Sequence, residues 1–596
     1  MRSEPGIAKR AATLQCGFAL LLTLLLISLV SAGAASAQYP AQYPSQSQVS
    51  KDGTAVLLED YADLPLSSPT HGTATNAPTN ANVEGQLGRV TSLRSEPAKA
   101  PLAASRFFVI DESATIYIFD KATRQFTPYL KFSQIFPKFV SDAGLATGID
   151  SIAFDPDYPK NGKFYTMHIE KPTLDGPAAP TNSAMPSLDL SGYTVTPAIN
   201  PPAGPVRYES VLIEWTDTNI RNATFEGTAR ELFRAGYDRN HPMSDLLFNP
   251  LAKRHQPDYG NLYIAAGDGA TGETPGPGHV LPQQLNNLMG KILRITPDIH
   301  LHPKDMLSAN GRYRIPSTGS DPNPFVSVTG ARPEIYAYGL RNPHRMTWDI
   351  PSKTLLVNDI GLHSWEEIDV VAKGGNYGYA EREGNEQVFV DPAGKTGSQL
   401  DPPVPFPDKD RLNVDGLAEP VTPLYPAAVY SHREGDSIGS GFVYRGKLMP
   451  QMRGKYVFND MTTGRIFYVN LDEMIATHGE RNHQAQIHEL QIVYKGPNDQ
   501  NPAKRRMFDI IAGNFTRRGG KPRPDHVLPG GGVATTGWKD DAHTQPRSDP
   551  EGVAYGGGRA DVRITVGGDG EIYVLSKSDG AIRKMTAVVT PPPASN

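Results

Sequence analysis

The sequence predicts an all-β protein built by radial repetition of short strand units, with long loops between them. The 57 Gly and 53 Pro among 596 residues exceed the average share but stay below the level typical of disorder. Short β-type runs bounded by Gly, Asp, Asn or Pro recur along the chain. They cover residues 107–110, 115–119, 163–167, 261–265, 465–469 and 571–575.

A weak internal repeat supports radial repetition. A turn followed by an aliphatic or aromatic residue and then Tyr recurs at Tyr117, Tyr165, Tyr263 and Tyr573. Repetition around an axis leaves few exposed sheet edges, which favours a β-propeller. A pair of packed β-sandwiches is the alternative.

The N-terminus has the pattern of a signal peptide. Basic residues at positions 2, 9 and 10 precede an apolar run over 16–30, and Ala-Ser-Ala at 35–37 offers a cleavage site near Ala37. A membrane anchor is the alternative, but the run is shorter than the ~20 apolar residues a span needs. We therefore predict a signal peptide over 1–37, a periplasmic or secreted protein, and no membrane span after cleavage.

The remaining chain divides by composition. Residues 38–104 are rich in Ser, Pro and Ala and predict an N-terminal arm, whereas 105–588 carry the strand runs and predict the folded domain. Residues 589–596 form a Pro-rich tail. Cys16, inside the signal peptide, is the sole cysteine, so a large hydrophobic core must hold the mature chain.

Long insertions separate the strand runs, and helices are scarce. The insertions cover 171–205, 270–282, 385–426 and 496–550, lengths typical of lids or binding walls. Residues 220–235 are the best candidate for an amphipathic helix. The net charge of −5 gives no electrostatic basis for binding nucleic acid or an anionic membrane.

Two short motifs resemble functional signatures without the context they need. Residues 267–272 fit G-x-G-x-x-G, but the Gly- and Pro-rich stretch that follows excludes the helix a dinucleotide site requires. Residues 435–439 fit G-x-S-x-G, but they lead into a strand instead of a helix. We interpret both as turns.

Four longer segments are more specific when taken together. They are Arg239-Asn-His-Pro-Met-Ser leading to 261–268, the stretch 288–297, Pro333-Glu-Ile-Tyr-Ala-Tyr-Gly-Leu-Arg-Asn-Pro343, and 358–368 closing with 374–379. Their order and spacing resemble the glucose/sorbosone dehydrogenases, which oxidise sugars with bound pyrroloquinoline quinone (PQQ). The resemblance implies a six-bladed β-propeller with long loop insertions over most of 105–585.

The resemblance also implies catalytic residues. His241 matches the family's catalytic histidine, whose pKa near operating pH suits removal of the sugar C1 hydroxyl proton. Asp268 matches the acid that orients this histidine. Arg341 and Asn342 match the pair that contacts the quinone, where a guanidinium stabilises developing negative charge. A loop histidine without a role, and a simple Asn-Pro turn at Asn342, are the structural alternatives.

Calcium positions follow in the same way. Gly361 and Leu362 fall where the family supplies main-chain carbonyls to the Ca²⁺ that bridges protein and PQQ, a cation that prefers oxygen ligands. Glu367 and Tyr377 resemble positions that line a second Ca²⁺ site. Solvated-face and core roles are equally open for these two residues.

The chain departs from the family pattern at two places. Ala146 stands where the family has Gln or Glu near the sugar, and Asp150 is a candidate replacement. At the far end, Arg559 or Arg563 could supply the family's arginine contact to PQQ, and we assign Arg559 to that role. The family's PQQ-contacting lysine has no clear counterpart, although His432 and Arg433 lie in that region.

The sequence thus predicts a periplasmic aldose dehydrogenase. It would transfer hydride from sugar C1 to calcium-bound PQQ and pass electrons to an external acceptor, a quinone or a cytochrome. A non-catalytic propeller that binds a ligand or a protein is the alternative. The sequence does not indicate which sugar is bound or how the chain oligomerises.

Overall fold

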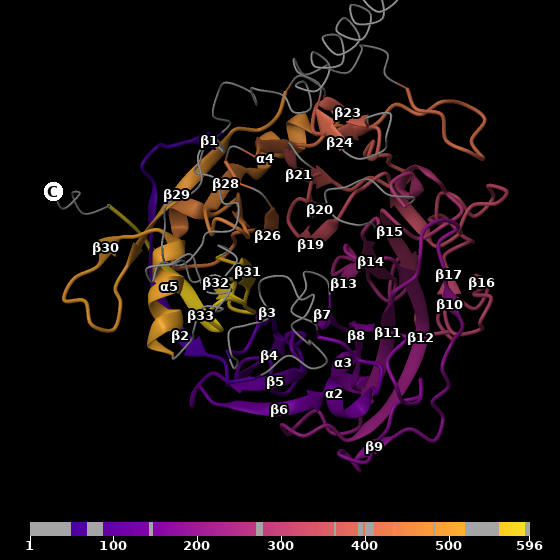
Figure 1. Cartoon of the computed structure of the whole chain (residues 1–596), viewed down its shortest axis with the longest axis horizontal. Coiled ribbons are helices and arrows are strands. Elements are labelled where there is room, and N and C mark those ends of the chain that lie inside the picture. The colour runs from indigo at the N-terminus through magenta and orange to yellow at the C-terminus, as the bar shows by residue number, and fades with distance from the viewer. Residues whose placement is uncertain are drawn as a thin grey trace, which may run out of the picture.

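The protein is a six-bladed β-propeller, as the sequence predicts (Figure 1). The structure is a computed structural model that describes residues 49–67, 87–141, 147–269, 278–362, 365–390, 397–399, 411–432, 434–435, 437–480, 483–518 and 560–590. The predicted signal peptide and most of the Pro-rich tail lie outside these residues.

Within the described residues, each blade has four principal antiparallel strands. Blade 1 contains β3 (Val90–Arg94), β4 (Arg106–Asp111), β5 (Thr115–Asp120) and β6 (Phe126–Lys131). Blade 2 contains β7 (Ile149–Phe154), β8 (Lys163–Glu170), β11 (Tyr208–Asp217) and β12 (Gly227–Tyr237), with β9 (Leu188–Asp189) and β10 (Ala198–Ile199) added beside β12. Blade 3 contains β13 (Met243–Phe248), β14 (Leu262–Ala266), β15 (Lys291–Ile295) and β18 (Ile335–Tyr338).

The other three blades follow the same plan. Blade 4 contains β19 (Pro343–Asp349), β20 (Thr354–Asp359), β21 (Trp365–Val370) and β25 (Ala428–Ser431). Blade 5 contains β26 (Ile438–Val443), β27 (Lys455–Asp460), β28 (Ile466–Asn470) and β29 (Ile487–Tyr494). Blade 6 contains β31 (Val562–Val566), β32 (Ile572–Ser576), β33 (Ala581–Val589) and β2 (Ala55–Asp63).

Two segments of the predicted N-terminal arm belong to the propeller. Strand β2 pairs antiparallel with β33 and supplies the outer strand of blade 6, and β3 is the inner strand of blade 1. The predicted domain boundary at residue 105 is therefore wrong. The physical reason is edge closure: β33 would otherwise expose unpaired main-chain groups, and β2 covers them. Strand β2 also pairs in parallel with β29, which joins blades 5 and 6 at the rim, and β1 (Val49–Ser50) extends β29.

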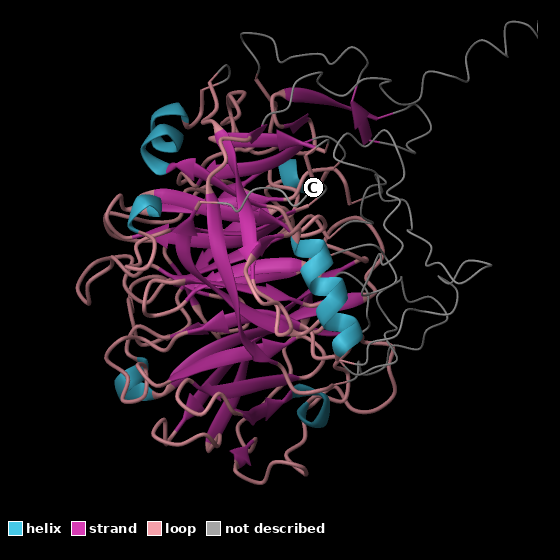
Figure 2. Ribbon diagram, turned by 90° about the vertical axis from the view of Figure 1, so that its left-hand side faces the viewer, coloured by secondary structure: helices cyan, strands magenta, loops and turns pink. Residues whose placement is uncertain are grey.

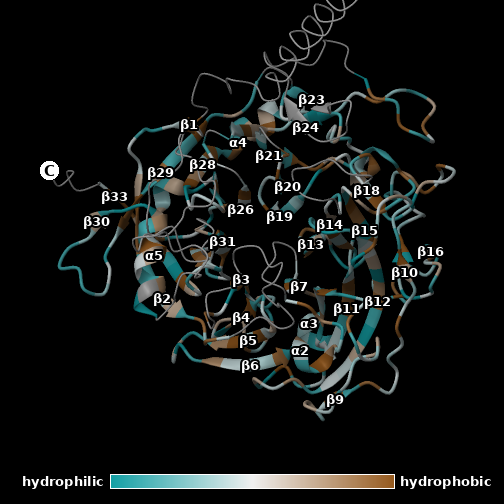
Figure 3. Cartoon of the chain, viewed as in Figure 1, coloured by the Kyte–Doolittle hydropathy of each residue, from teal (hydrophilic) through white to brown (hydrophobic). Residues whose placement is uncertain are grey.

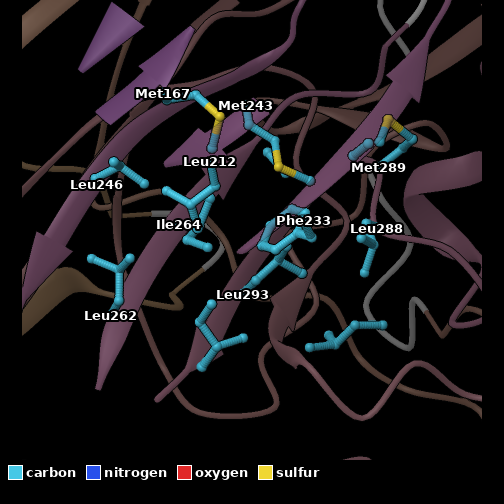
Figure 4. Packing of buried hydrophobic residues seen from close by; sticks show 14 of the residues in the cluster. Met167, Leu212, Phe233, Met243, Leu246, Leu262, Ile264, Leu288, Met289 and Leu293 are labelled. Atoms are coloured by element: carbon cyan, nitrogen blue, oxygen red, sulfur yellow. The ribbon is translucent and has the colours of Figure 1, made fainter. Parts of the chain in front are cut away.

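The blades are held together by apolar side chains that pack between neighbouring sheets. Every residue of β4 is buried, because each blade is covered by a neighbour on both faces. One cluster joins blades 2 and 3 and includes Leu212, Phe233, Leu246 and Ile264 (Figure 4). Each fully buried side chain of this kind contributes about 1.5–3 kcal/mol. Figure 3 shows hydrophobic residues along strands such as β5 and hydrophilic residues on the outer loops.

Helices are few and short in the described residues. They are α2 (Phe132–Ile135), α3 (Tyr158–Asn161), α4 (Leu471–Thr477) and α5 (Met507–Arg517), with 3₁₀ turns at Leu281–Gln283 and Pro450–Met452. The predicted helix over 220–235 is wrong: its second half belongs to β12, whose pairing with β11 overrides the local pattern. None of the helices described is long and apolar enough to cross a membrane.

The insertions carry short hairpins. Strands β16 (Met306–Leu307) and β17 (Arg314–Ile315) pair with each other, as do β22 (Arg382–Glu383), β23 (Glu386–Val390) and β24 (Gly397–Gln399) in series, and β30 (Ala503–Lys504) extends β29. Viewed from the side, the strands run between two faces on which the connecting loops lie (Figure 2).

The strand order determines which loops can meet. The inner strands β3, β7, β13, β19, β26 and β31 contact one another in a closed ring around the axis. All begin at one face, and because the strands are antiparallel, the loop between the second and third strand of each blade returns to that face. Each blade therefore brings two segments to the same end of the propeller axis, here called the mouth.

Candidate active site

The predicted catalytic residues come from these converging segments. His241 directly precedes β13, and Asp268 lies in the loop between β14 and β15. Arg341 and Asn342 directly precede β19, and Gly361 follows β20. Residues far apart in the sequence are thus delivered to one face of blades 3 and 4.

His241 and Asp268 form a hydrogen-bonded pair. The distance between Nδ1 of His241 and Oδ1 of Asp268 is 2.7 Å. The Asp268 side chain is fully buried, whereas 12% of the His241 side chain is exposed. A buried carboxylate at Nδ1 favours the tautomer that is protonated there, which leaves Nε2 as the basic atom. This is the arrangement of a histidine base with an orienting acid.

The main chain around His241 explains the glycines of the Gly-Asp-Gly motif. His241 has a φ of 56°, a left-handed conformation that costs a non-glycine residue about 1–3 kcal/mol. The Gly269 N–H donates to the His241 carbonyl (3.2 Å), and the Gly267 N–H donates to the Pro242 carbonyl (3.1 Å). A Cβ atom on Gly267 would lie 2.4 Å from the His241 carbonyl oxygen. Only glycine allows this approach at position 267.

Arg341 is joined to the same pair through the main chain. The Asp268 N–H donates to the Arg341 carbonyl at 2.7 Å. The Arg341 residue is only 3% exposed. Its guanidinium Nη1 donates to the carbonyls of Ile360 (3.0 Å) and Gly361. The structure therefore brings His241, Asp268, Arg341 and Gly361 together.

Asn342 is held by a buried carboxylate. The main-chain N–H groups of Arg341 and Asn342 both donate to Asp359, at 2.9 and 2.6 Å. The Asn342 carbonyl accepts a hydrogen bond from Ile360. Asp359 thus fixes the turn that leads into β19, a role that the sequence analysis did not assign.

Gly361 and Leu362, the predicted carbonyl ligands of calcium, lie at the end of β20. The Gly361 carbonyl is occupied by the Arg341 guanidinium, so a cation at this oxygen requires Arg341 to turn away. The Leu362 side chain packs with Tyr379 and Ala380, and its N–H donates to Glu383 at 2.8 Å.

Glu367, predicted at a second calcium site, belongs to a cluster of three buried carboxylates. Oxygen atoms of Asp359, Glu367 and Asp369 lie within 4.8 Å of one another. Asp359 pairs with Glu367 across β20 and β21, and Asp369 follows two residues later on the same face. Neither carboxylate oxygen of Asp369, a fully buried residue, has a hydrogen-bond partner among the described residues. Three converging carboxylates offer the hard oxygen ligands that Ca²⁺ prefers.

Electrostatics supports a cation in this cluster. Burial, followed by the neighbouring acids, raises the pKa of Glu367 and Asp369 well above the ordinary value. Burial raises the pKa of Asp359 to about 7. A divalent cation would remove this repulsion and stabilise the ionised forms.

Tyr377 does not bring its hydroxyl to the cluster. The hydroxyl donates to the Val370 carbonyl (2.8 Å) and accepts from the Ala372 N–H (2.8 Å). The Tyr377 side chain therefore braces the turn after β21, which leaves only its main chain for a metal ion.

Two further pairs near Arg341 were missed by the sequence analysis. His279 Nδ1 lies 3.1 Å from the Tyr379 hydroxyl, and burial lowers the pKa of His279. His432 Nε2 lies 2.8 Å from Oε1 of Glu366, whose pKa burial raises to about 7. Tyr379 ends a segment that the resemblance already singled out, but His279 and Glu366 carry no sequence signal of their own.

The remaining predicted positions are placed as follows. Arg559, Ala146 and Arg433 lie outside the described residues. Asp150 is the second residue of β7 and Arg563 the second residue of β31, so both are on inner strands. Ser437 precedes strand β26, consistent with a turn serine.

The chain is similar to known proteins over parts of its length. Residues 300–402 match the family described as Glucose / Sorbosone dehydrogenase. The chain is 27% identical to the HIPL1 protein of Arabidopsis thaliana over 333 residues, 53% of this chain and 42% of the plant protein. It is 24% identical to quinoprotein glucose dehydrogenase B of Acinetobacter calcoaceticus over 334 residues, 56% of this chain and 58% of that protein.

Similar solved structures include a PQQ-bound aldose sugar dehydrogenase from Streptomyces coelicolor. It is 16% identical, with a TM-score of 0.44, over 91% of this chain and 99% of that one. The matched part of this chain spans less than half the length of the plant relative and somewhat more than half of the bacterial one. The segment 300–402 contains Arg341, Gly361 and Glu367. This segment of the chain is thus similar to the glucose/sorbosone dehydrogenase family.

Proposed function

We propose that this protein is an exported aldose dehydrogenase that uses PQQ and Ca²⁺ and passes electrons to an external acceptor. The observation that carries the proposal is the His241–Asp268 pair, 2.7 Å apart and joined to Arg341 through the Asp268 main chain. A histidine base beside a buried guanidinium fits a reaction in which a hydroxyl proton leaves while negative charge develops nearby.

The residues divide the reaction between them. Nε2 of His241 takes the proton of the sugar C1 hydroxyl as the C1–H bond breaks and C1 becomes a carbonyl carbon. Asp268 holds the ring through Nδ1–H and stabilises the imidazolium that forms. When bound, PQQ would accept the hydride from C1. Arg341, with its fixed positive charge, would stabilise negative charge at the acceptor.

The residues present fit a Ca²⁺ ion as they stand, whereas binding of the cofactor requires one of them to move. The carboxylates of Asp359, Glu367 and Asp369 fit a buried Ca²⁺ and would hold it next to the turn that carries Arg341. At the Gly361 carbonyl, Arg341 now takes the place of a cation. Cofactor binding there requires the guanidinium to leave this carbonyl and face the ligand.

A second candidate function is a binding propeller without redox chemistry. The hydrogen bond from Arg341 to the Gly361 carbonyl favours this second function. An arginine at this carbonyl competes with the metal ion that the dehydrogenase would need there. Under this alternative, dye reduction does not exceed background for the wild-type protein.

Titration of the mature protein with PQQ separates the two functions. We expect PQQ to bind in the presence of Ca²⁺, seen as a change in quinone absorbance, and the loaded protein to reduce a dye with at least one member of an aldose panel. A protein that binds no PQQ with Ca²⁺ present contradicts the proposal. A protein that binds PQQ but oxidises no aldose contradicts only the sugar assignment.

A further inference from the structure

The second residues of five of the six inner strands, β3, β7, β13, β19 and β31, form a polar ring around the propeller axis. In β3, β7, β13 and β19 this position is a bulge, where one residue is skipped in the pairing with the next strand. Bulges re-aim side chains and occur beside functional sites. The bulged residues are Thr91, Asp150, Ser244 and His344, and Arg563 takes the same position in β31.

Arg345, the residue after the bulge of β19, spans several blades. Its Nη1 donates to the carbonyls of Ser244 (2.8 Å) and His344 (2.8 Å), and its Nη2 donates to the Asp150 carbonyl (3.4 Å). The guanidinium therefore reaches from blade 4 across blade 3 to blade 2, which places it near the axis where these inner strands meet. The residue is 7% exposed.

Arg345 has no carboxylate partner among the residues that the structure describes. The charges of Asp245 and Asp150 both act on Arg345, but Asp245 pairs with Arg94 at 2.9 Å. Asp561 pairs with Arg563 at 3.1 Å. In the same mouth, Glu112 pairs with Arg89 and Lys577 at 2.9 and 2.8 Å. A buried guanidinium that meets only carbonyl dipoles is a costly arrangement unless an anion accompanies it.

Three ring residues have buried polar atoms without a protein partner in the described part of the chain. These atoms are Arg563 Nε, His344 Nε2 and Asp150 Oδ2. They come from blades 6, 4 and 2, whose inner strands belong to the closed ring around the axis. The charges of Arg345, Arg563 and Lys577 lower the pKa of both Asp150 and His344, which indicates that these side chains lie near one another.

We propose that this ring of inner-strand residues around the propeller axis binds a small oxyanion of the carboxylate class. Arg345 and Arg563 supply the positive charge, and His344 Nε2–H and the Asp150 carboxyl group donate hydrogen bonds. Burial and Glu112 raise the pKa of Asp150 to about 8, so at neutral pH this carboxyl is protonated and can donate. The anion is either free or part of a sugar acid that enters from the mouth.

The proposal does not depend on redox activity, so it is tested without PQQ. Thermal unfolding of the mature protein at pH 7 is followed in sodium acetate, sodium gluconate, sodium chloride and glucose, at matched ionic strength for the salts. We expect acetate or gluconate to raise the midpoint with saturation, because a ligand that binds the folded state stabilises it. Saturation with acetate indicates a free anion, and saturation with gluconate alone indicates a sugar acid.

Variants identify the site. Arg563→Gln and His344→Gln should each weaken the apparent anion affinity by about tenfold or more, the effect of losing a charge-assisted hydrogen bond. Arg254→Gln is the control, because this arginine side chain is 61% exposed and outside the ring; it should behave as wild type. If Arg563→Gln does not fold, His344→Gln, which keeps a hydrogen-bonding side chain, carries the test alone. The proposal is overturned if neither anion exceeds chloride, or if the folded ring variants keep the wild-type affinity.

Discussion

The inner strands of all blades begin at the same mouth, yet two groups of blades carry different chemistry. Blades 3 and 4 form the proposed catalytic half, and blades 6, 1 and 2 form the proposed charge-binding half. On blades 3 and 4, His241, Asp268 and Arg341 are joined by short direct contacts. On the opposite side, Glu112, Lys577 and Arg563 form ion pairs, and Asp150 is left with an unpartnered oxygen. The propeller supplies the same backbone positions throughout, and local side chains decide whether a blade carries the proposed catalytic residues or the proposed anion site.

The first prediction concerns a substitution that displaces His241 and leaves the polar side chains of the catalytic half unchanged. Gly267→Ala places a Cβ atom 2.4 Å from the His241 carbonyl and 2.6 Å from its Cβ, so the histidine must move. A displacement near 1 Å can cost about 10²-fold in rate, and we expect a loss of this size in sugar-dependent dye reduction. Gly192→Ala is the control, since nothing lies within 4 Å of its added Cβ. Wild-type activity in Gly267→Ala would show that the close approach does not position His241.

The second prediction concerns the carboxylate cluster beside the catalytic half. Ca²⁺ should raise the thermal midpoint of the wild-type protein, and Asp369→Asn should abolish this shift because it removes a ligand. In EDTA the variant should unfold at or above the wild-type temperature, since one of three crowded carboxylates is neutralised. Asp472→Asn, at an exposed position of helix α4, is the control. An unchanged Ca²⁺ shift in Asp369→Asn would exclude this cluster as the metal site.

The catalytic half could be predicted from the sequence because its residues lie in contiguous motifs. Gly267-Asp-Gly and Arg341-Asn342 each fix a turn at a strand end, and the propeller brings these turns together. The carboxylate cluster was only half predicted, because it depends on the register that pairs Asp359 with Glu367. Alternating acids at 367 and 369 were the available signal.

The other features could not be predicted, because they depend on contacts between residues that are far apart in the sequence. The pairing of β2 with β33 joins segments near the two ends of the chain, and the apolar run that begins β2 does not indicate which strand it pairs with. The helix expected over 220–235 failed because a period of 3.6 residues arose by coincidence in a strand of blade 2. The polar ring depends on contacts across the axis, between residues as distant as Asp150 and Arg345.

The third prediction concerns the effect of Asp150, in the charge-binding half, on the pH dependence of stability. The pKa of Asp150 is about 8 in the folded protein and near 3.8 when unfolded. The unfolded state therefore binds fewer protons between these values, and stability falls as the pH rises through this window. The groups facing Asp150 are Glu112, Arg345, Lys577 and Arg563.

Asp150→Asn should remove this contribution. The difference in unfolding free energy between wild type and variant should change by at most about 1.4 kcal/mol per pH unit between pH 5 and 7.5 and level off above pH 8. Denaturant unfolding over this range measures it, with Asp472→Asn as the control. A wild-type pH profile in Asp150→Asn would contradict the protonated state of this carboxyl.

The role of His241 as the base is tested most directly by comparing two histidines. His241 and His302 both adopt left-handed conformations, with φ of 56° and 51°, but His302 lies in blade 3 away from the mouth and contacts the Tyr259 carbonyl. His241→Gln should lower the rate of sugar oxidation by about 10²–10⁴-fold with PQQ and Ca²⁺ binding retained, and His302→Gln should keep the wild-type rate. Equal rates for His241→Gln and wild type in the PQQ-loaded protein would contradict the claim.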